Sequence, residues 1–149
     1  MSCSINTRCK DMLDEMYKNV KMGVDAIVDI MPKVKDDGLR GELTAQLEKY
    51  GSFTQKIEDI LHSDGCAPKE EGFITKISSK MGIAMNTMMD DTTSHLAQMI
   101  IEGATMGITN MTRLLRENEN TSCSEEILTL ARDIIKYEES TVENMKKYL

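Results

Sequence analysis

Apolar side chains recur at spacings of three and four residues along most of this chain. This is the period of an α-helix, and it gives each helix one apolar face. No segment shows the alternation of β-branched residues and hairpin turns that is typical of strands. The pattern therefore predicts an all-α fold, and 149 residues fit one domain with a buried core. The clearest stripe comprises Leu13, Met16, Tyr17, Val20, Val24, Ile27, Ile30 and Met31.

The ends of these stripes and the residues beside them predict where the helices begin and end. Pro32 ends the first helix, because the residue before a proline avoids the α conformation. Five residues that favour helix caps, at 90–94, divide the region 72–118 into two helices, and one bent helix is the alternative. Ser122 and Glu125 form a capping-box pattern before the last helix. The expected helices cover residues 10–31, 37–62, 72–89, 92–118 and 124–148.

The connection between the second and third long helices decides the expected topology. The first and last connections are only a few residues long, so each flanking pair of helices should be antiparallel. A helix at 72–89 would be roughly 27 Å long, and residues 66–72 in extended form could supply the rest of the bundle height. We therefore expect a ferritin-like four-helix bundle with a long helical crossover. The alternative is an up-down-up-down bundle in which the third helix is bent or overhangs.

The charge and the apolar segments of the chain exclude several classes of function. A net charge of −7 and a pI near 4.9 argue against binding to nucleic acid, which needs a basic face. The longest apolar stretch, at 99–108, is interrupted by Glu102 and is too short to span a bilayer. The first residues lack the apolar core of a signal peptide. These features predict a cytoplasmic protein, whose four cysteines would be reduced thiols.

A ferritin-like di-iron site would need a Glu from each of two helices and a Glu-x-x-His from each of the other two. Glu48 is followed at the third position by Gly51, and Glu138 by Thr141. Because both histidines are absent, we expect no cofactor. The alternative is a weaker iron or manganese site built from Glu48, Glu102 and Glu138, with or without His95.

Glu138 lies on the apolar stripe of the last helix, where a carboxylate is costly to bury. We expect it to be hydrogen-bonded to Tyr50, Thr141 or another polar core group.

Two further groups of residues have both a structural and a functional interpretation. With a full-height crossover, the four cysteines would share one end of the bundle, either as incidental loop residues or as a redox-sensitive or crosslinking thiol cluster; without a CxxC unit, a metal site is the weaker alternative. The methionines of the third region either fill the core or line an adaptable apolar groove. The cysteines are Cys3, Cys9, Cys66 and Cys123, and the methionines are Met81, Met85, Met88, Met99 and Met106.

Three stretches resemble an uncharacterised family of short ferritin-like proteins from anaerobic Firmicutes, including gut bacteria. They are KMGIAMNTMMD at 80–90, SHLAQMIIEGATMGI at 94–108, and the C-terminal segments 137–139 and 145–149. The resemblance implies a bacterial source and a ferritin-like bundle, without an assigned chemistry.

These observations lead to three hypotheses for the function. The first is a non-enzymatic bundle that associates with itself, as a homodimer, or with another helical partner. The second is a metal-binding or redox protein that uses the carboxylates of the bundle core. The third is a binding module with a Met-lined apolar groove.

Overall fold

The computed structural model describes residues 3–68, 90–121 and 123–149, and these residues form four long helices and no strand. The expectation of an all-α bundle is confirmed for this part of the chain. The expected crossover helix at 72–89, with Met81, Met85 and Met88, lies outside the described residues. The long helices are α1 (Thr7–Ile30), α2 (Asp37–Ser63), α4 (Thr93–Asn118) and α5 (Glu125–Met145), with short 3-10 helices η1 (Met31–Lys33) and η2 (Lys146–Tyr148).

Each long helix begins at a polar residue whose side chain accepts a hydrogen bond from a backbone N–H of the first turn. Such caps satisfy donors that have no partner inside the helix. Thr92 caps α4, so residues 90–92 precede that helix and are not part of it. The cap of α5 is Ser124 and not Ser122, since the Ser124 hydroxyl accepts from the Ile127 N–H. The four N-cap residues are Asn6, Asp36, Thr92 and Ser124.

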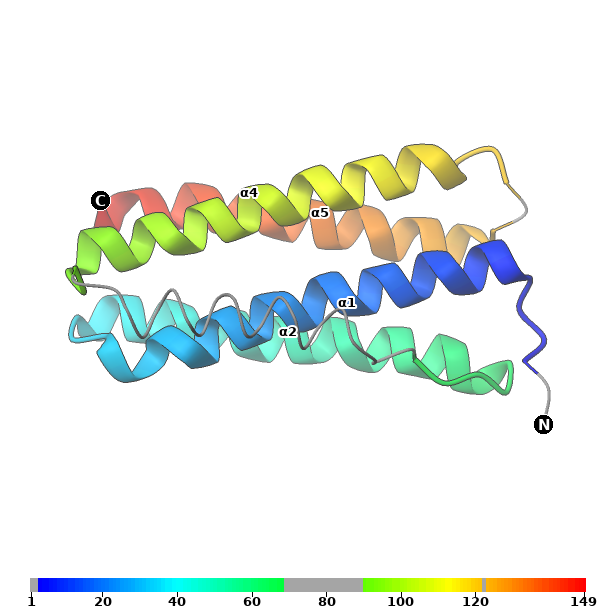
Figure 1. Ribbon diagram of the computed structural model, residues 1–149, viewed down its shortest axis with the longest axis horizontal. Coiled ribbons are helices and arrows are strands. Elements are labelled where there is room, and N and C mark those ends of the chain that lie inside the picture. The colour runs from blue at the N-terminus through cyan, green and yellow to red at the C-terminus, as the bar shows by residue number, and fades with distance from the viewer. Residues whose placement is uncertain (1–2, 69–89, 122) are drawn as a thin grey trace.

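The helices pack as two antiparallel hairpins, α1–α2 and α4–α5, that lie side by side (Figure 1). α1 packs along α4 over much of its length, whereas α2 and α5 have fewer contacts. A continuous core of buried aliphatic residues, methionines and aromatic rings fills the space between them. Among the helices that the structure describes, none is long and apolar enough to cross a membrane.

The two hairpins are connected across the length of the bundle. α2 ends at the end of the bundle where α1 begins, and α4 begins at the opposite end (Figure 1). Two contacts mark these ends: Cys3 is bonded to Cys66, and Lys35 Nζ lies 3.8 Å from Asp91 Oδ2. The chain therefore enters α4 from the end opposite to that at which it leaves α2.

All four cysteines lie at one end of the bundle, which we call the disulfide end, and they form two disulfide bonds, Cys3–Cys66 and Cys9–Cys123. The expectation of four reduced thiols is therefore wrong. The reason is spatial: the start of α1 lies beside both the segment that follows α2 and the segment that precedes α5.

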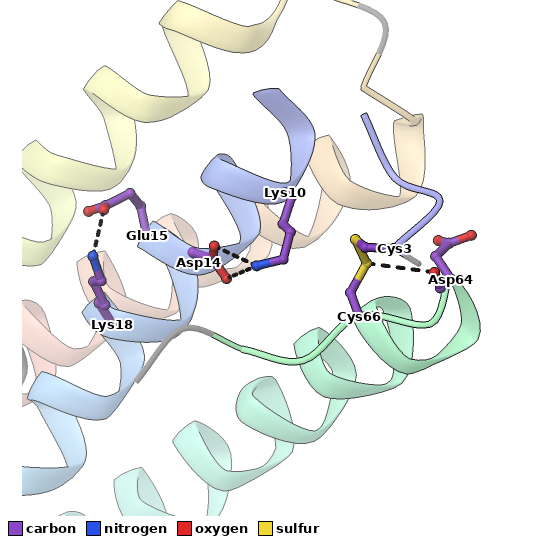
Figure 2. Close-up of polar contacts among 7 residues, drawn as sticks. All are labelled: Cys3, Lys10, Asp14, Glu15, Lys18, Asp64 and Cys66. Atoms are coloured by element: carbon purple, nitrogen blue, oxygen red, sulfur yellow. Dashed lines mark hydrogen bonds and ion pairs between the residues drawn. A yellow bond between two sulfur atoms is a disulfide. The ribbon is translucent and has the colours of Figure 1, made fainter. Parts of the chain in front are cut away.

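Polar contacts support the disulfide end. Beside Cys3–Cys66, the Ser4 N–H donates to the Asp64 carbonyl oxygen at 2.9 Å. One turn into α1, Lys10 forms an ion pair at 2.8 Å with Asp14, whose side chain is nearly buried (Figure 2). The N-terminal segment is thus fixed to the end of α2 by both a covalent bond and a hydrogen bond.

Candidate functional site

A cavity of about 210 Å³ lies between the helices in the middle of the bundle. We call it the interhelical cavity. All four long helices contribute to its lining, the surface of which is mainly apolar, and its described lining contains no Lys, Arg or His. The lining residues are Asn19, Met22, Gly23, Ala26 and Ile27 of α1, Gln46 and Tyr50 of α2, residues 99, 100, 102–104, 106 and 107 of α4, and Glu138 of α5.

Glu138 is the buried acid of this cavity, with 3% of its surface exposed. Asn19 Nδ2 donates a hydrogen bond to Glu138 Oε1 at 3.2 Å. Burial disfavours the charged form and raises the pKa of the Glu138 carboxyl to about 8, although the Asn19 hydrogen bond acts in the opposite direction. Glu138 is therefore mainly protonated and neutral at neutral pH. The burial expected from its place on the apolar stripe is confirmed, and its partner is Asn19.

Glycines on α1 and α4 make room for the polar side chains of the cavity. A Cβ atom added to Gly107 would overlap the Glu138 carboxyl group, so a larger residue at this position would force that side chain to move. Gly23 has a similar relation to Tyr50, because an added Cβ would lie 3.0 Å from two atoms of the ring. Each hairpin thus contains one glycine that lets a polar side chain of the next helix approach closely.

Tyr50 forms part of the wall on the α2 side. Burial, together with the nearby Glu138 and Tyr137, raises the pKa of the Tyr50 hydroxyl well above its usual range. The hydroxyl therefore keeps its proton at physiological pH. The Tyr50 ring meets the Tyr137 ring edge-to-face, with 5.8 Å between the ring centroids, which fixes its position in the wall.

Gln46 is the second buried polar residue of α2 in the lining, and it is 3% exposed. Its Oε1 atom has no hydrogen-bond partner among the described residues. A buried acceptor without a partner costs about 1–3 kcal/mol. A side chain that lines the cavity thus contains a buried acceptor whose hydrogen-bonding capacity is not satisfied by the described residues.

The rim of the cavity is formed by exposed residues of α4. Met106 is 55% exposed, and Glu102 and Gly103 are also exposed. The Glu102 carboxylate accepts a hydrogen bond of 2.9 Å from Gln98 Nε2. The rim therefore offers an apolar surface and a negative charge beside the route into the cavity.

Of the residues of the alternative metal site, Glu102 and Glu138 line the same cavity, whereas Glu48 and His95 are not among its lining residues. Glu48 is exposed on α2, two positions from the inward-facing Gln46 and Tyr50, and a shift of two positions turns a helical side chain to nearly the opposite face. His95 lies in the first turn of α4, with its Nδ1 4.0 Å from Asp90 Oδ2. Among the described residues, no three His, Cys, Asp or Glu side chains form a group that could hold a metal ion.

Some residues of the cavity were expected from the sequence and others were missed. Of the methionines proposed for a groove, Met99 and Met106 do line the cavity. Asn19, Met22 and Gln46 were not singled out. Gln46 lies three residues after Leu43 and four before Tyr50, so the helical period did carry a signal for it.

Comparisons of the chain with protein-family models, with curated proteins and with solved structures gave no match.

Proposed function

We propose that this protein is a non-enzymatic helical bundle that binds a small, mainly apolar molecule in the interhelical cavity. The observation that carries the proposal is Gln46, a residue of the cavity lining whose buried Oε1 has no partner among the described residues. Together with Met99 and Met106 in the lining, this favours the hypothesis of a Met-lined binding module over a metal centre.

The size of the cavity limits the ligand to a small molecule. A cavity of about 150 Å³ lined by aliphatic and aromatic side chains can hold benzene. A space of about 210 Å³ can therefore hold a molecule somewhat larger than benzene. Polar side chains of the lining would orient such a molecule, as in other ligand sites.

The described lining supports binding more than catalysis. It contains no Ser, Cys, His or Lys that Glu138 could activate as a nucleophile. The hydrogen-bond partner of Glu138 is the amide of Asn19, which neither takes up nor releases a proton at physiological pH.

For the scaffold, we propose the ferritin-like topology that the sequence led us to expect. What supports it is that α2 ends and α4 begins at opposite ends of the bundle (Figure 1). Self-association also remains a prediction, and Val28 and Met106 are large apolar side chains that are more than half exposed. Size-exclusion chromatography with light scattering tests it: a dimer mass supports self-association, and a monomer mass contradicts it.

The two disulfide bonds bear on the compartment in which the protein works. Disulfides persist in oxidising compartments and are rare in the cytoplasm. We therefore propose an oxidising environment instead of the cytoplasmic location expected from the sequence. Alkylation of the protein in intact cells, followed by mass spectrometry, tests this: four alkylated cysteines would contradict it.

Neutral apolar probes test the proposed function. Benzene and indole should raise the melting temperature of the protein, with dissociation constants in the micromolar to millimolar range that suits ligands of this size. Ala26→Leu and Ala104→Leu fill the cavity from two different helices and should abolish this effect. Gly41→Ala is the control, because Gly41 is exposed on α2 and an added Cβ meets nothing within 4 Å. Equal probe binding by the filled and native proteins would overturn the proposal.

A further inference from the structure

We infer that the preferred ligand of the interhelical cavity is a small organic amine, whose protonated nitrogen is held by Glu138 and Gln46 while its apolar body lies against the methionines. This inference rests on the proposed function, and it adds the chemical class of the ligand.

The charge of the lining favours a cationic ligand. Both ionisable carboxyl groups of the cavity are acidic, Glu138 inside and Glu102 at the rim, and the described lining offers no cationic side chain. An anionic ligand, such as a fatty acid, would meet acids without a cationic partner. A cationic ligand would find a negative charge at the entrance and, inside, a carboxyl group that can lose its proton to become the counter-ion.

The hydrogen-bond acceptors of the lining favour a ligand with several N–H donors. Gln46 Oε1 needs a donor, and the Glu138 carboxylate, once ionised, also accepts hydrogen bonds. An ammonium group has several N–H donors and no acceptor, so one nitrogen can satisfy both groups. A hydroxyl has a single donor and can satisfy only one of them at a time.

The aromatic ring of Tyr50 also favours a cationic ligand. The face of an aromatic ring attracts a cation that lies within about 6 Å of its centroid. Tyr50 lines the same cavity as Glu138 and Gln46, and its packing against Gly23 and Tyr137 fixes the ring. An ammonium ion held by Glu138 therefore lies in a cavity whose wall includes the Tyr50 ring.

Binding of the amine is coupled to the release of a proton. In the free protein near neutral pH, Glu138 carries a proton, and in solution an alkylamine is protonated with a pKa near that of lysine. The complex contains the ammonium ion and the Glu138 carboxylate, so the carboxyl proton leaves to solvent. The other titratable groups of the lining are Tyr50 of α2 and Glu102 of α4, while α1 contributes none.

The experiment compares three probes that share a phenyl group and a short carbon chain: phenethylamine, phenethyl alcohol and phenylacetate. Titration calorimetry near pH 7 should show the amine binding at least tenfold more tightly than the alcohol, and phenylacetate most weakly. Repeating the amine titration in two buffers of different ionisation enthalpy should show the release of about one proton. Between about pH 6 and pH 8 the affinity for the amine should rise roughly fiftyfold, since Glu138 loses its proton over this range, while the affinity for the alcohol stays level.

Glu138→Gln is the matched variant, because it keeps the shape of the side chain and removes its charge. It should bind the alcohol as the native protein does, lose the preference for the amine, and release no proton. The proton count on the native protein needs no variant, so misfolding of Glu138→Gln would leave the test intact.

Two outcomes would overturn the inference: the alcohol or phenylacetate binding as tightly as the amine, or the amine binding without release of a proton. If benzene and indole still bind in that case, the proposed function stands and only the amine preference fails. Displacement of the amine by Mn²⁺ or Fe²⁺ alone, at a stoichiometry of one, would also overturn it in favour of a metal site.

Discussion

The disulfide end and the middle of the bundle are held together in different ways. At the disulfide end, two covalent bonds join the start of α1 to the segments that follow α2 and precede α5. The middle instead contains a cavity, a buried carboxyl group and an amide oxygen without a partner among the described residues. Each of these features lowers stability. The difference suggests that the covalent end offsets the cost of a binding site in the middle.

Among the changes that test this comparison, removal of the disulfides should have the largest effect on stability. In the chain-entropy account, bonds that close loops of 63 and 114 residues each stabilise the fold by about 4–5 kcal/mol, and the sum is smaller because the loops overlap. Cys3→Ser with Cys66→Ser, and Cys9→Ser with Cys123→Ser, should each lower the free energy of unfolding by about 2–5 kcal/mol in urea denaturation, with the chain-entropy value as the upper end of that range. The native protein in a reducing agent is the control. If its stability did not change on reduction, the disulfides would not offset the cost of the cavity.

Glu138→Gln should have the next largest effect, and it should depend on pH. The pKa of Glu138 is raised from 4.5 to about 8 in the folded protein, so the unfolded chain ionises first as the pH rises. The stability of the native protein should therefore fall between about pH 4.5 and pH 8, by an amount of the order of a few kcal/mol, and then level off. Glu138→Gln should remove this fall and be the more stable protein at pH 8.

Urea denaturation at several pH values measures this effect of Glu138. Glu139→Gln is the control, because its neighbour Glu139 is exposed on the same helix. The stability of the native protein is compared with that of Glu138→Gln and of Glu139→Gln at each pH. If the native stability rose between pH 5 and pH 8 relative to Glu138→Gln, the Glu138 carboxyl would not be neutral in the folded protein.

Gly107→Ala should destabilise the middle of the bundle by about 1–3 kcal/mol, since the new methyl group overlaps the Glu138 carboxyl. Gly103→Ala on the same helix is the matched control: an added Cβ meets nothing within 4 Å, so this variant should gain up to about 1 kcal/mol from helix propensity. Thermal denaturation measures both. The cost of Gly107→Ala should shrink in a Glu138→Ala background, and an unchanged cost would show that Glu138 is not the group that Gly107 accommodates.

Lys35→Ala should have the smallest effect. The Lys35–Asp91 ion pair lies opposite the disulfide end, its N–O distance is 3.8 Å, and 80% of the lysine side chain is exposed. Exposed ion pairs of this kind contribute less than about 1 kcal/mol. Urea denaturation should show a change within about 0.5 kcal/mol. A larger loss would mean that this end, too, depends on one specific contact.

The helical period accounts for the part of the structure that the sequence predicted well. It located the apolar stripes, and it marked Glu138 as a carboxyl group inside the core. It also carried a signal for Gln46, although a single polar residue on an apolar stripe resembles an ordinary interruption. Glu48 was selected for its chemistry alone, although its position on α2 turns it away from Gln46 and Tyr50.

The disulfide pairing could not be predicted from the sequence. Four cysteines allow three pairings, and the choice depends on which chain segments meet at the end of the bundle. The close fit of Gly107 against Glu138 likewise depends on the distance between α4 and α5. A sequence pattern shows which face of each helix is buried. Disulfide pairing and close contacts depend in addition on the distance between two helices and on how they are rotated relative to each other.

The Cys9–Cys123 bond has a consequence for the continuity of the chain. Any single cut in the backbone between residues 9 and 123 leaves one piece with Cys9 and the other with Cys123, so the two pieces remain joined. A protein nicked once by a protease in this span would keep its mass on a non-reducing gel and separate into two fragments only after reduction. The bundle therefore has more than one covalent path between its two hairpins, and the loss of one peptide bond does not divide it.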